Sequence, residues 1–380
     1  MVPEMNDYLL RLISSILACL LPVLHCTAEN RPDAIHLGAF LPLSGNLASY
    51  GEQIRHGIEL AAADLTAEGN AIALHFEDTP MSGPGVLSAF RKLNDSLKVS
   101  GIAGNFSNVA MLTMAPVLRR SQVVAMHTAA MDDEILSAGQ GSCFSTNTRV
   151  RDEAARMAKY AFDSGYQRVA IVTIETNFGI EYRKHFKAAF ETLGGSVVAD
   201  ESYQLGDIDY RTQLARVRAA QPDAIFAATF GHFLGLTIRQ ARELGEKAQI
   251  LSVYEAEDES VLSAAGRHAD GLRYFVSYDP SGTEASLQVR NRLAQRLGKT
   301  PSTFSLNAYD ATILLAKALI SCQAKKPCVS DWLRRVKTYE GVSGVFSIAA
   351  DGAAERSFHL REIRGGRFSS ADQGGTKLPK

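Results

Sequence analysis

Residues 35–65 decide the fold of this chain, and they read IHLGAFLPLSGNLASYGEQIRHGIELAAADL. The first part, Ile35–Phe40, is a short apolar run of the kind that forms a β-strand. A cluster of turn-forming residues then breaks the pattern, namely Pro42, Ser44, Gly45 and Asn46. The stretch therefore predicts a strand that ends in a polar loop.

A helix is predicted to follow this loop. Ser49 is a suitable N-cap, and Glu52 three residues later would complete a capping box in which each side chain satisfies a free backbone amide. Apolar residues then recur at helical spacing, at Ile54, Ile58, Ala61, Ala62 and Leu65. Gly69 stands where a C-terminal cap belongs. Strand, loop and helix make the first half of a βαβ unit, and α/β folds bind ligands at loops of this kind.

The same alternation continues along the chain. Further strands are predicted at residues 73–76, 99–104, 123–126, 168–174, 196–203, 224–229 and 249–253. Helical patterns stand between most of them, and the unbroken apolar run at 168–174 is typical of a strand buried in a parallel sheet. We therefore predict an α/β fold of right-handed parallel units with helices on both faces of each sheet.

Length and composition agree with a two-lobed soluble protein. A chain of 380 residues is long for one hydrophobic core. Hydrophobic residues make up 46% and charged residues 21% of the chain, which is ordinary for a soluble globular protein. The formal net charge of -1 leaves no concentrated basic face and argues against a nucleic-acid partner.

The N-terminal segment is interpreted as an export signal. Leu12–Leu24 is almost entirely apolar but short for a bilayer span, and small residues follow it. Residues 1–28 are therefore predicted to be a signal peptide, and the mature periplasmic chain to begin near Glu29. Two alternatives stay open. One is an uncleaved membrane anchor, and the other is a lipoprotein anchored at Cys19, whose lipobox is poor because Leu17 is bulky.

Three cysteines remain after this signal, Cys143, Cys322 and Cys328. The last two bracket a short polar loop, and a disulfide there would add about 2 kcal/mol in the chain-entropy model. An oxidising periplasm permits that bond, and two free surface thiols are the alternative. Cys143 begins an apolar segment and is predicted to be a buried free thiol.

The opening stretch resembles the branched-chain amino acid (Leu/Ile/Val)-binding proteins, a family of type I periplasmic solute-binding proteins of ABC transporters. In that family Ser44–Gly45, Tyr50–Gly51 and the helix carrying Gly57 recur as a block. The likeness extends from Ile35 to about Phe368 through blocks at residues 206–217, 221–225, 239–245, 307–311 and 344–366. The order and spacing of these blocks carry the resemblance.

The resemblance implies two doubly wound parallel-sheet lobes that close on a ligand by hinge motion. Three crossovers would join the lobes, near Ser145–Arg149, Ser277–Pro280 and Glu340–Gly344. The implied first lobe comprises residues 34–146 plus 279–340, the second lobe residues 147–278 plus 341–370, and the C-terminal tail residues 371–380.

The common sequence motifs of catalytic, nucleotide-binding and metal sites are absent from the sequence. It contains no H-E-x-x-H, Walker loop, complete G-x-G-x-x-G or G-x-S-x-G. The nine histidines show no spacing typical of metal ligands. We therefore expect no metal, no cofactor and no enzymatic activity.

Ligand-binding residues in the first lobe follow from the resemblance. In the family, the loop after the third strand supplies a serine to the ligand's carboxylate, and the matching position is Asn108, with Ser107 beside it. The next such loop would add backbone donors, and it contains Thr128, Ala129, Ala130 and Met131. Met131 replaces the family's threonine unless Thr128 takes that role, so strict recognition of branched-chain amino acids does not follow.

The second lobe is expected to contribute aromatic residues and an acid. Phe178, Phe230 and either Tyr254 or Glu255 match the family's positions, and Tyr50 matches an aromatic of the first lobe. Glu255 is the plausible partner for a ligand ammonium. The alternative for Glu255 is a solvated helix start, and the alternative for each aromatic ring is ordinary packing between the lobes.

The sequence is therefore interpreted as an exported solute-binding protein. It would trap an amino acid or related small carboxylate and deliver it to the membrane permease of an ABC importer, acting as a monomer. Two other functions stay open. One is a periplasmic sensor that docks on a membrane signalling partner, because a fold does not settle function. The other is a periplasmic enzyme.

Overall fold

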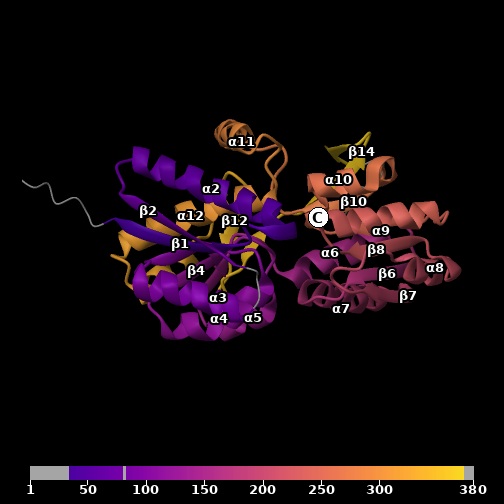
Figure 1. Ribbon diagram of the computed structural model, residues 1–380, viewed down its shortest axis with the longest axis horizontal. Helices are drawn as coiled ribbons and strands as arrows, with labels where there is room; N and C mark the ends of the chain where they lie inside the picture. The colour runs from indigo at the N-terminus through magenta and orange to yellow at the C-terminus, as the bar shows by residue number, and fades with distance from the viewer. Residues whose placement is uncertain (1–33, 80–82, 372–380) are drawn as a thin grey trace, which may run out of the picture. The chain divides into compact units, whose positions relative to one another are not determined.

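The computed structural model describes residues 34–79 and 83–371 (Figure 1). The predicted signal peptide at 1–28 and nearly all of the predicted tail at 371–380 lie outside the described residues. Within the described ranges, the chain forms two mainly parallel sheets with helices on both faces, as predicted. None of the helices in these ranges is both long and apolar enough to cross a bilayer.

The first lobe is built on an all-parallel sheet in the order β2-β1-β3-β4-β5. Its strands are β1 (Ile35–Leu41), β2 (Ile72–Asp78), β3 (Gly101–Gly104), β4 (Val124–His127) and β5 (Cys143–Ser145). Its N-terminal helical segments are η1 (Gly45–Leu47), α2 (Ala48–Ala67), α3 (Gly83–Arg91), the π-helical η2 (Lys92–Ser96), α4 (Asn108–Arg120) and α5 (Asp133–Gly139). The later helices α11 (Glu284–Leu297), α12 (Thr303–Ser321) and α13 (Lys326–Arg334) complete it.

Alternation along β1 explains the two layers of helices. Leu37 and Ala39 join the hydrophobic cluster that contains α2 and α12, whereas Phe40 joins the cluster built by α3, α4 and α5. Figure 1 shows these two groups of helices on opposite sides of the first sheet. Both faces of β1 are buried, because successive side chains of a strand point to opposite faces.

The second lobe repeats this strand order and extends it as β7-β6-β8-β9-β10-β14-β15. Its strands are β6 (Arg168–Ile174), β7 (Ser196–Tyr203), β8 (Ala224–Ala228), β9 (Gln249–Ser252), β10 (Arg273–Val276), β14 (His359–Arg364) and β15 (Arg367–Ser370). Its helices are α6 (Val150–Asp163), α7 (Asn177–Thr192), α8 (Arg211–Ala219), α9 (Gly231–Glu243), η3 (Tyr254–Ala256), α10 (Glu259–Ala265) and η4 (Gly266–Ala269). The strands up to β10 are parallel, and β14 and β15 add an antiparallel edge.

The third crossover between the lobes lies later in the chain than the expected segment Glu340–Gly344. Strands β11 (Tyr339–Gly341), β12 (Gly344–Ile348) and β13 (Ala354–Arg356) form a small antiparallel sheet of their own. This sheet is tied to the first lobe, since the amide of Ser145 donates to the carbonyl of Gly352 at 2.9 Å. The chain joins the second sheet only at β14, so residues 341–356, expected in the second lobe, contact the first.

The predicted capping box of α2 is wrong. The helix begins at Ala48, its N-cap residue is Leu47, and no side chain caps it. The turn η1 leads directly into α2, which places Ser49 inside the first helical turn, where its hydroxyl accepts a hydrogen bond from Lys299 Nζ at 2.9 Å. Glu52 instead pairs with Arg55. The predicted C-terminal glycine is correct, because Gly69 follows the helix with a φ of 92°.

Cysteine chemistry in the structure is simple. Cys322 and Cys328 form a disulfide between the end of α12 and the start of α13, with their Cα atoms 5.6 Å apart. Cys143, on β5, is buried and free.

Candidate functional site

A pocket of about 150 Å³ lies at the carboxyl ends of parallel strands from both lobes. Its lining residues are Leu47, Phe106, Ser107, Asn108, Val109, Ala129, Ala130, Thr176, Asn177, Phe178, Tyr182, Leu205, Phe230, Tyr254 and Glu255. All of them lie in loops or helices that follow a strand, at the edge where open α/β sheets bind ligands. This pocket is the candidate ligand-binding site.

Most of the residues singled out in the sequence meet in this pocket. They are Ser107, Asn108, Ala129, Ala130, Phe178, Phe230 and Glu255. Both members of the Tyr254/Glu255 alternative line it as well, since η3 places the two side chains in succession after β9. Their contact with a ligand stays a prediction.

Three predicted residues are not part of the lining. Thr128 is fully buried and its hydroxyl donates to the carbonyl of Asn105 at 2.8 Å. Met131 packs into the hydrophobic cluster with α4 and α5. Tyr50 stacks on Phe106 with ring centroids 5.0 Å apart, so it lies behind the pocket wall. The strand ends place these residues near the pocket, but packing directs their side chains away from its surface.

Several lining residues were not singled out from the sequence. Phe106, Val109, Thr176 and Asn177 lie beside predicted site residues, so the strand-end rule could have found them. Tyr182 lies well inside α7, and Leu205 follows the edge strand β7. Leu47 belongs to η1, where the sequence predicted only a turn. No pattern in the sequence points to these last three.

Two helix N-termini supply the donor side of the pocket. Ser107 caps α4 by accepting from the amide of Ala110 at 3.3 Å, and Thr176 caps α7 by accepting from the amide of Gly179 at 3.5 Å. The free amides and the dipole of a helix N-terminus attract negative charge. This end of the pocket is therefore suited to a carboxylate.

The side chain of Asn108, predicted to donate to that carboxylate, is already engaged. Its Nδ2 donates to Asp132 at 3.0 Å, and its Oδ1 lies 2.9 Å from Nε2 of His127. Burial lowers the pKa of His127 to about 3, so this ring is neutral and its Nε2 carries the proton that Oδ1 accepts. Backbone amides of α4, rather than this side chain, are the donors left for a ligand.

Glu255 forms the acidic end of the pocket and is not a solvated residue. It is 4% exposed, and its Oε2 has no hydrogen-bond partner among the described residues. Burial first, and then the nearby carboxylate of Glu153, hold the pKa of Glu255 well above its usual range. A buried carboxylate without a partner is costly. Glu255 is therefore suited to meet a positive group of a ligand.

The wall between these two ends is aromatic. It is formed by Phe106, Phe178, Tyr182, Phe230 and Tyr254. Phe178 packs edge-on against Phe230, with ring centroids 5.5 Å apart. The lining holds no Lys, Arg or His, and in the described part of the chain no cluster of potential metal ligands occurs. The pocket thus suits an apolar body with a negative group at one end and a positive group at the other.

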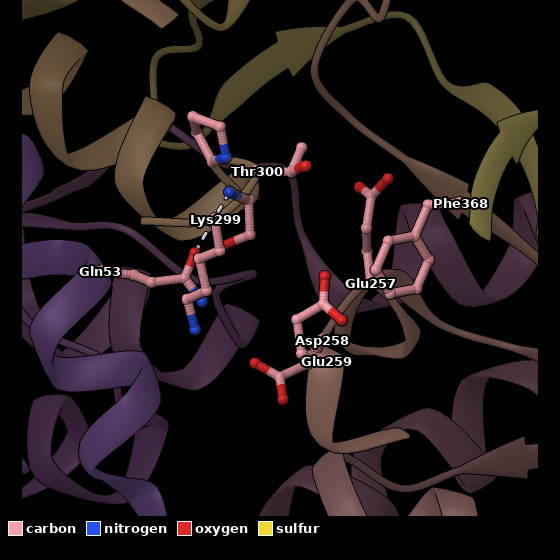
Figure 2. Close-up of a pocket in the computed structure, with 9 residues that line it drawn as sticks. Gln53, Glu257, Asp258, Glu259, Lys299, Thr300 and Phe368 are labelled. Atoms are coloured by element: carbon pink, nitrogen blue, oxygen red, sulfur yellow. Dashed lines mark hydrogen bonds between the residues drawn. The ribbon is translucent and has the colours of Figure 1, made fainter. Parts of the chain in front are cut away.

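Figure 2 shows a second, much smaller cavity of about 10 Å³. The carboxylates of Asp258 and Glu259 lie across it from the side chains of Gln53 and Lys299, and Glu257 lies beside Phe368. The dashed line marks the hydrogen bond from the amide of Ser302 to Oε1 of Gln53 at 3.1 Å. A space of this size holds about one water molecule, so we interpret it as a polar contact between the lobes rather than a ligand site.

A comparison with known families identifies this architecture. The model of the family described as "Periplasmic binding protein" matches residues 34–367. The chain belongs to the periplasmic binding protein family. The resemblance inferred from the sequence is therefore confirmed, as is the prediction that this periplasmic binding protein is a solute-binding protein and not an enzyme.

Individual relatives of this periplasmic binding protein are distant. The Leu/Ile/Val-binding protein homolog 2 of Brucella abortus is 23% identical over 348 residues, which cover 88% of this chain and 92% of the relative. The branched-chain amino acid substrate-binding protein LivJ of Streptococcus pneumoniae, solved with isoleucine, aligns with a TM-score of 0.81 and 22% identity over 88% of this chain and 97% of its own. A solute-binding protein of R. palustris, solved with 4-hydroxybenzoate, aligns with a TM-score of 0.82 and 21% identity over 89% and 96% of the two chains.

Proposed function

We propose that this protein captures an amino acid with an apolar side chain between its two lobes and delivers it to the membrane permease of an ABC importer. The observation that carries the proposal is the buried carboxylate of Glu255, whose Oε2 has no hydrogen-bond partner among the described residues and which lies in the same pocket as the helix N-termini of α4 and α7. An ammonium would meet Glu255, and a carboxylate would meet the free amides beyond Ser107 and Thr176. The aromatic wall would enclose the side chain.

An aromatic carboxylate without an amino group is the second candidate. The aromatic wall favours it, and the R. palustris neighbour was solved with such a ligand. A benzoate, however, would form no ion pair with Glu255 and would bring its own negative charge close to this buried acidic side chain. We therefore rank the amino acid first.

The setting of this function is also part of the proposal. The predicted signal peptide at 1–28 would export the chain to the periplasm, with anchoring at Cys19 as the alternative. A monomer that closes by hinge motion would serve an importer, and the same ligand capture would serve a sensor with a membrane signalling partner. Genes for a permease and an ATPase beside this gene favour import, and a kinase gene favours sensing.

A direct experiment begins with native mass spectrometry of freshly purified protein, to identify a co-purified small molecule. Calorimetry then compares leucine, isoleucine and phenylalanine with their counterparts that lack the amino group, 4-methylpentanoate, 3-methylpentanoate and 3-phenylpropanoate, and with benzoate. We expect an amino acid to bind at least roughly tenfold more tightly than its counterpart, which corresponds to about 1.4 kcal/mol. Tighter binding of benzoate or of the counterparts would overturn the proposal.

A further inference from the structure

We propose that Glu153, which does not line the pocket, makes the site select a ligand with a positive group. Glu153 and Glu255 form a buried pair of carboxyl groups that has no cation beside it among the described residues. The ligand's ammonium supplies that cation. This inference rests on the proposed function and deepens it. It assigns the preference for an amine to a residue of α6, outside the ligand-contacting loops.

The position of Glu153 is defined by two hydrogen bonds. Its Oε2 accepts from the hydroxyl of Tyr182 at 2.6 Å, and its Oε1 accepts from the backbone amide of Tyr254 at 3.0 Å. Both donor residues line the pocket, whereas Glu153 itself is 3% exposed and lies behind them. Because each carboxylate oxygen accepts one bond, these contacts favour the ionised form of Glu153.

Glu255 follows Tyr254 directly and shares this environment. In the described part of the chain its Oε2 has no hydrogen-bond partner, and the nearby charge of Glu153 adds to burial in disfavouring its ionised form. Two buried carboxylates that interact in this way do not both ionise easily. Glu153 accepts two hydrogen bonds and ionises first, so Glu255 is the member that keeps its proton to higher pH while the pocket is empty.

The other titratable groups around the pair bring no positive charge. Tyr50 from α2, Tyr182 from α7 and Tyr254 from η3 all face it, and burial raises the pKa of each phenol well above its usual value, so all three are neutral. The remaining charged group that acts on this cluster is Asp258, which is itself acidic.

The cations of α6 and its N-cap are engaged elsewhere. Arg149 pairs with Asp351 at 2.6 Å and with Asp152 at 3.2 Å. Arg151 pairs with Asp133 at 2.7 Å, Lys159 pairs with Asp163 at 3.0 Å, and Arg156 lies over the ring of Phe275. No cation of this helix contacts Glu153 or Glu255 among the residues described, so a ligand is the available source of positive charge.

Binding of an amino acid therefore exchanges one cation for another. The ligand's ammonium takes the place of the proton on Glu255, that proton leaves to solvent, and both carboxylates are ionised in the complex. A ligand without an amino group leaves the proton in place and gains no ion pair. Glu153 thus strengthens the preference for an amine by adding a second negative charge close to the ammonium.

The exchange has a defined dependence on pH. In the range where the empty pair holds a proton and the complex does not, the association constant for an amino acid rises with pH by about tenfold per unit. Binding of the counterpart without an amino group lacks this rise. Burial raises the pKa of Glu153 to about 7, so above neutral pH the empty pair holds a single proton, on Glu255.

The test uses the full mature protein, the Glu153→Gln variant, and Asp152→Asn as the control, because Asp152 is the neighbouring, partly exposed carboxylate on α6. Calorimetry near pH 8 in two buffers of different ionisation enthalpy measures the protons released when leucine binds. We expect about one proton for the wild type and the control, and markedly fewer for Glu153→Gln. Near pH 8, the preference for leucine over 4-methylpentanoate should fall about tenfold in Glu153→Gln alone.

Each outcome has a distinct meaning. If the wild type binds no amino acid, the proposed function fails. If the wild type prefers leucine but Glu153→Gln keeps both the proton release and the full preference, the proposed function stands and this inference is wrong. If Glu153→Gln does not fold, Tyr182→Phe decides, because it keeps the charge of Glu153 and removes one bond to it. Loss of that bond should move the pH range in which the association constant for leucine rises to higher pH. If this pH range is the same as in the wild type, the inference is wrong.

Discussion

The backbone amide of Ala130, in the first lobe, donates a hydrogen bond of 3.1 Å to the hydroxyl of Tyr254, in the second. The sequence predicted the Ala130 amide as a donor to the ligand's carboxylate. In the structure, that donor is taken by a side chain from the opposite lobe, and Tyr254 also packs against Phe304 of α12 with ring centroids 5.4 Å apart. A ligand carboxylate must therefore displace the tyrosine hydroxyl before it can use this amide.

Replacing Tyr254 with Phe tests this competition. The change removes the hydroxyl and leaves a buried amide without a partner in the ligand-free protein, at a cost of about 1–3 kcal/mol in the free energy of unfolding. Affinity for the amino acid should be unchanged or higher, because the carboxylate no longer competes with the hydroxyl. Urea unfolding and calorimetry measure the two effects. A tenfold loss of affinity would mean that the hydroxyl itself binds the ligand.

The disulfide should affect stability alone. It joins the end of α12 to the start of α13, and neither cysteine lines the ligand pocket. Replacing Cys322 and Cys328 together with Ala should lower the free energy of unfolding by about 2 kcal/mol, since the bond restricts the unfolded chain. Urea unfolding of the variant and calorimetry with the ligand are the measurements. An affinity that changes along with stability would contradict this separation.

The elements of the sheets were largely predictable because their patterns are local. β6 and β7 have the predicted bounds. For β6 an unbroken apolar run is visible in the chain itself. The sequence did not predict the small sheet of β11, β12 and β13, because its position against the first lobe depends on a distant contact, the bond between Ser145 and Gly352. The end of α2 was correct and its start was not, because the preceding η1 turn, rather than a side-chain cap, determines where the helix begins.

The site follows the same rule. The resemblance to the family identified Ser107, Ala130 and Glu255, and all three lie in loops at strand ends, which the topology of the parallel sheets brings together. Glu153 could not be found in this way. It lies in the first turn of a helix, where an acidic residue is usually a favourable surface charge, and only the contacts with Tyr182 and Tyr254 reveal it as buried.

Asp132 should make stability depend on pH. Its carboxylate accepts from Asn108 of the first lobe at 3.0 Å and from Asn177 of the second at 3.3 Å. Burial, with a smaller effect of Glu181, raises its pKa from 3.8 to about 7. The folded protein therefore binds a proton that the unfolded chain has released over this range, and the contribution of Asp132 to stability falls as pH rises through it.

The Asp132→Asn variant lacks this titration. Its free energy of unfolding, relative to that of the wild type, should therefore increase with pH by up to about 1.4 kcal/mol per unit below neutrality. Urea unfolding of both proteins at several pH values is the measurement. Parallel stability profiles of the two proteins would show that Asp132 does not titrate in this range.

Glu255→Gln is the sharpest test of the charge arrangement, and Glu259→Gln is its matched control. Both residues belong to the acidic run at 255–259, but Glu255 is buried in the pocket and Glu259 is exposed at the start of α10. The first change removes the partner of the ligand's ammonium and leaves that cation buried, at a cost of about 2–5 kcal/mol in binding. The second removes a solvated charge and should leave the affinity unchanged.

Calorimetry near pH 8 with the identified amino acid separates the two variants. If Glu255→Gln binds that amino acid as tightly as the wild type, the ammonium does not meet Glu255, and the ligand is better described as a carboxylate without an amino group, held by the helix N-termini and the aromatic wall.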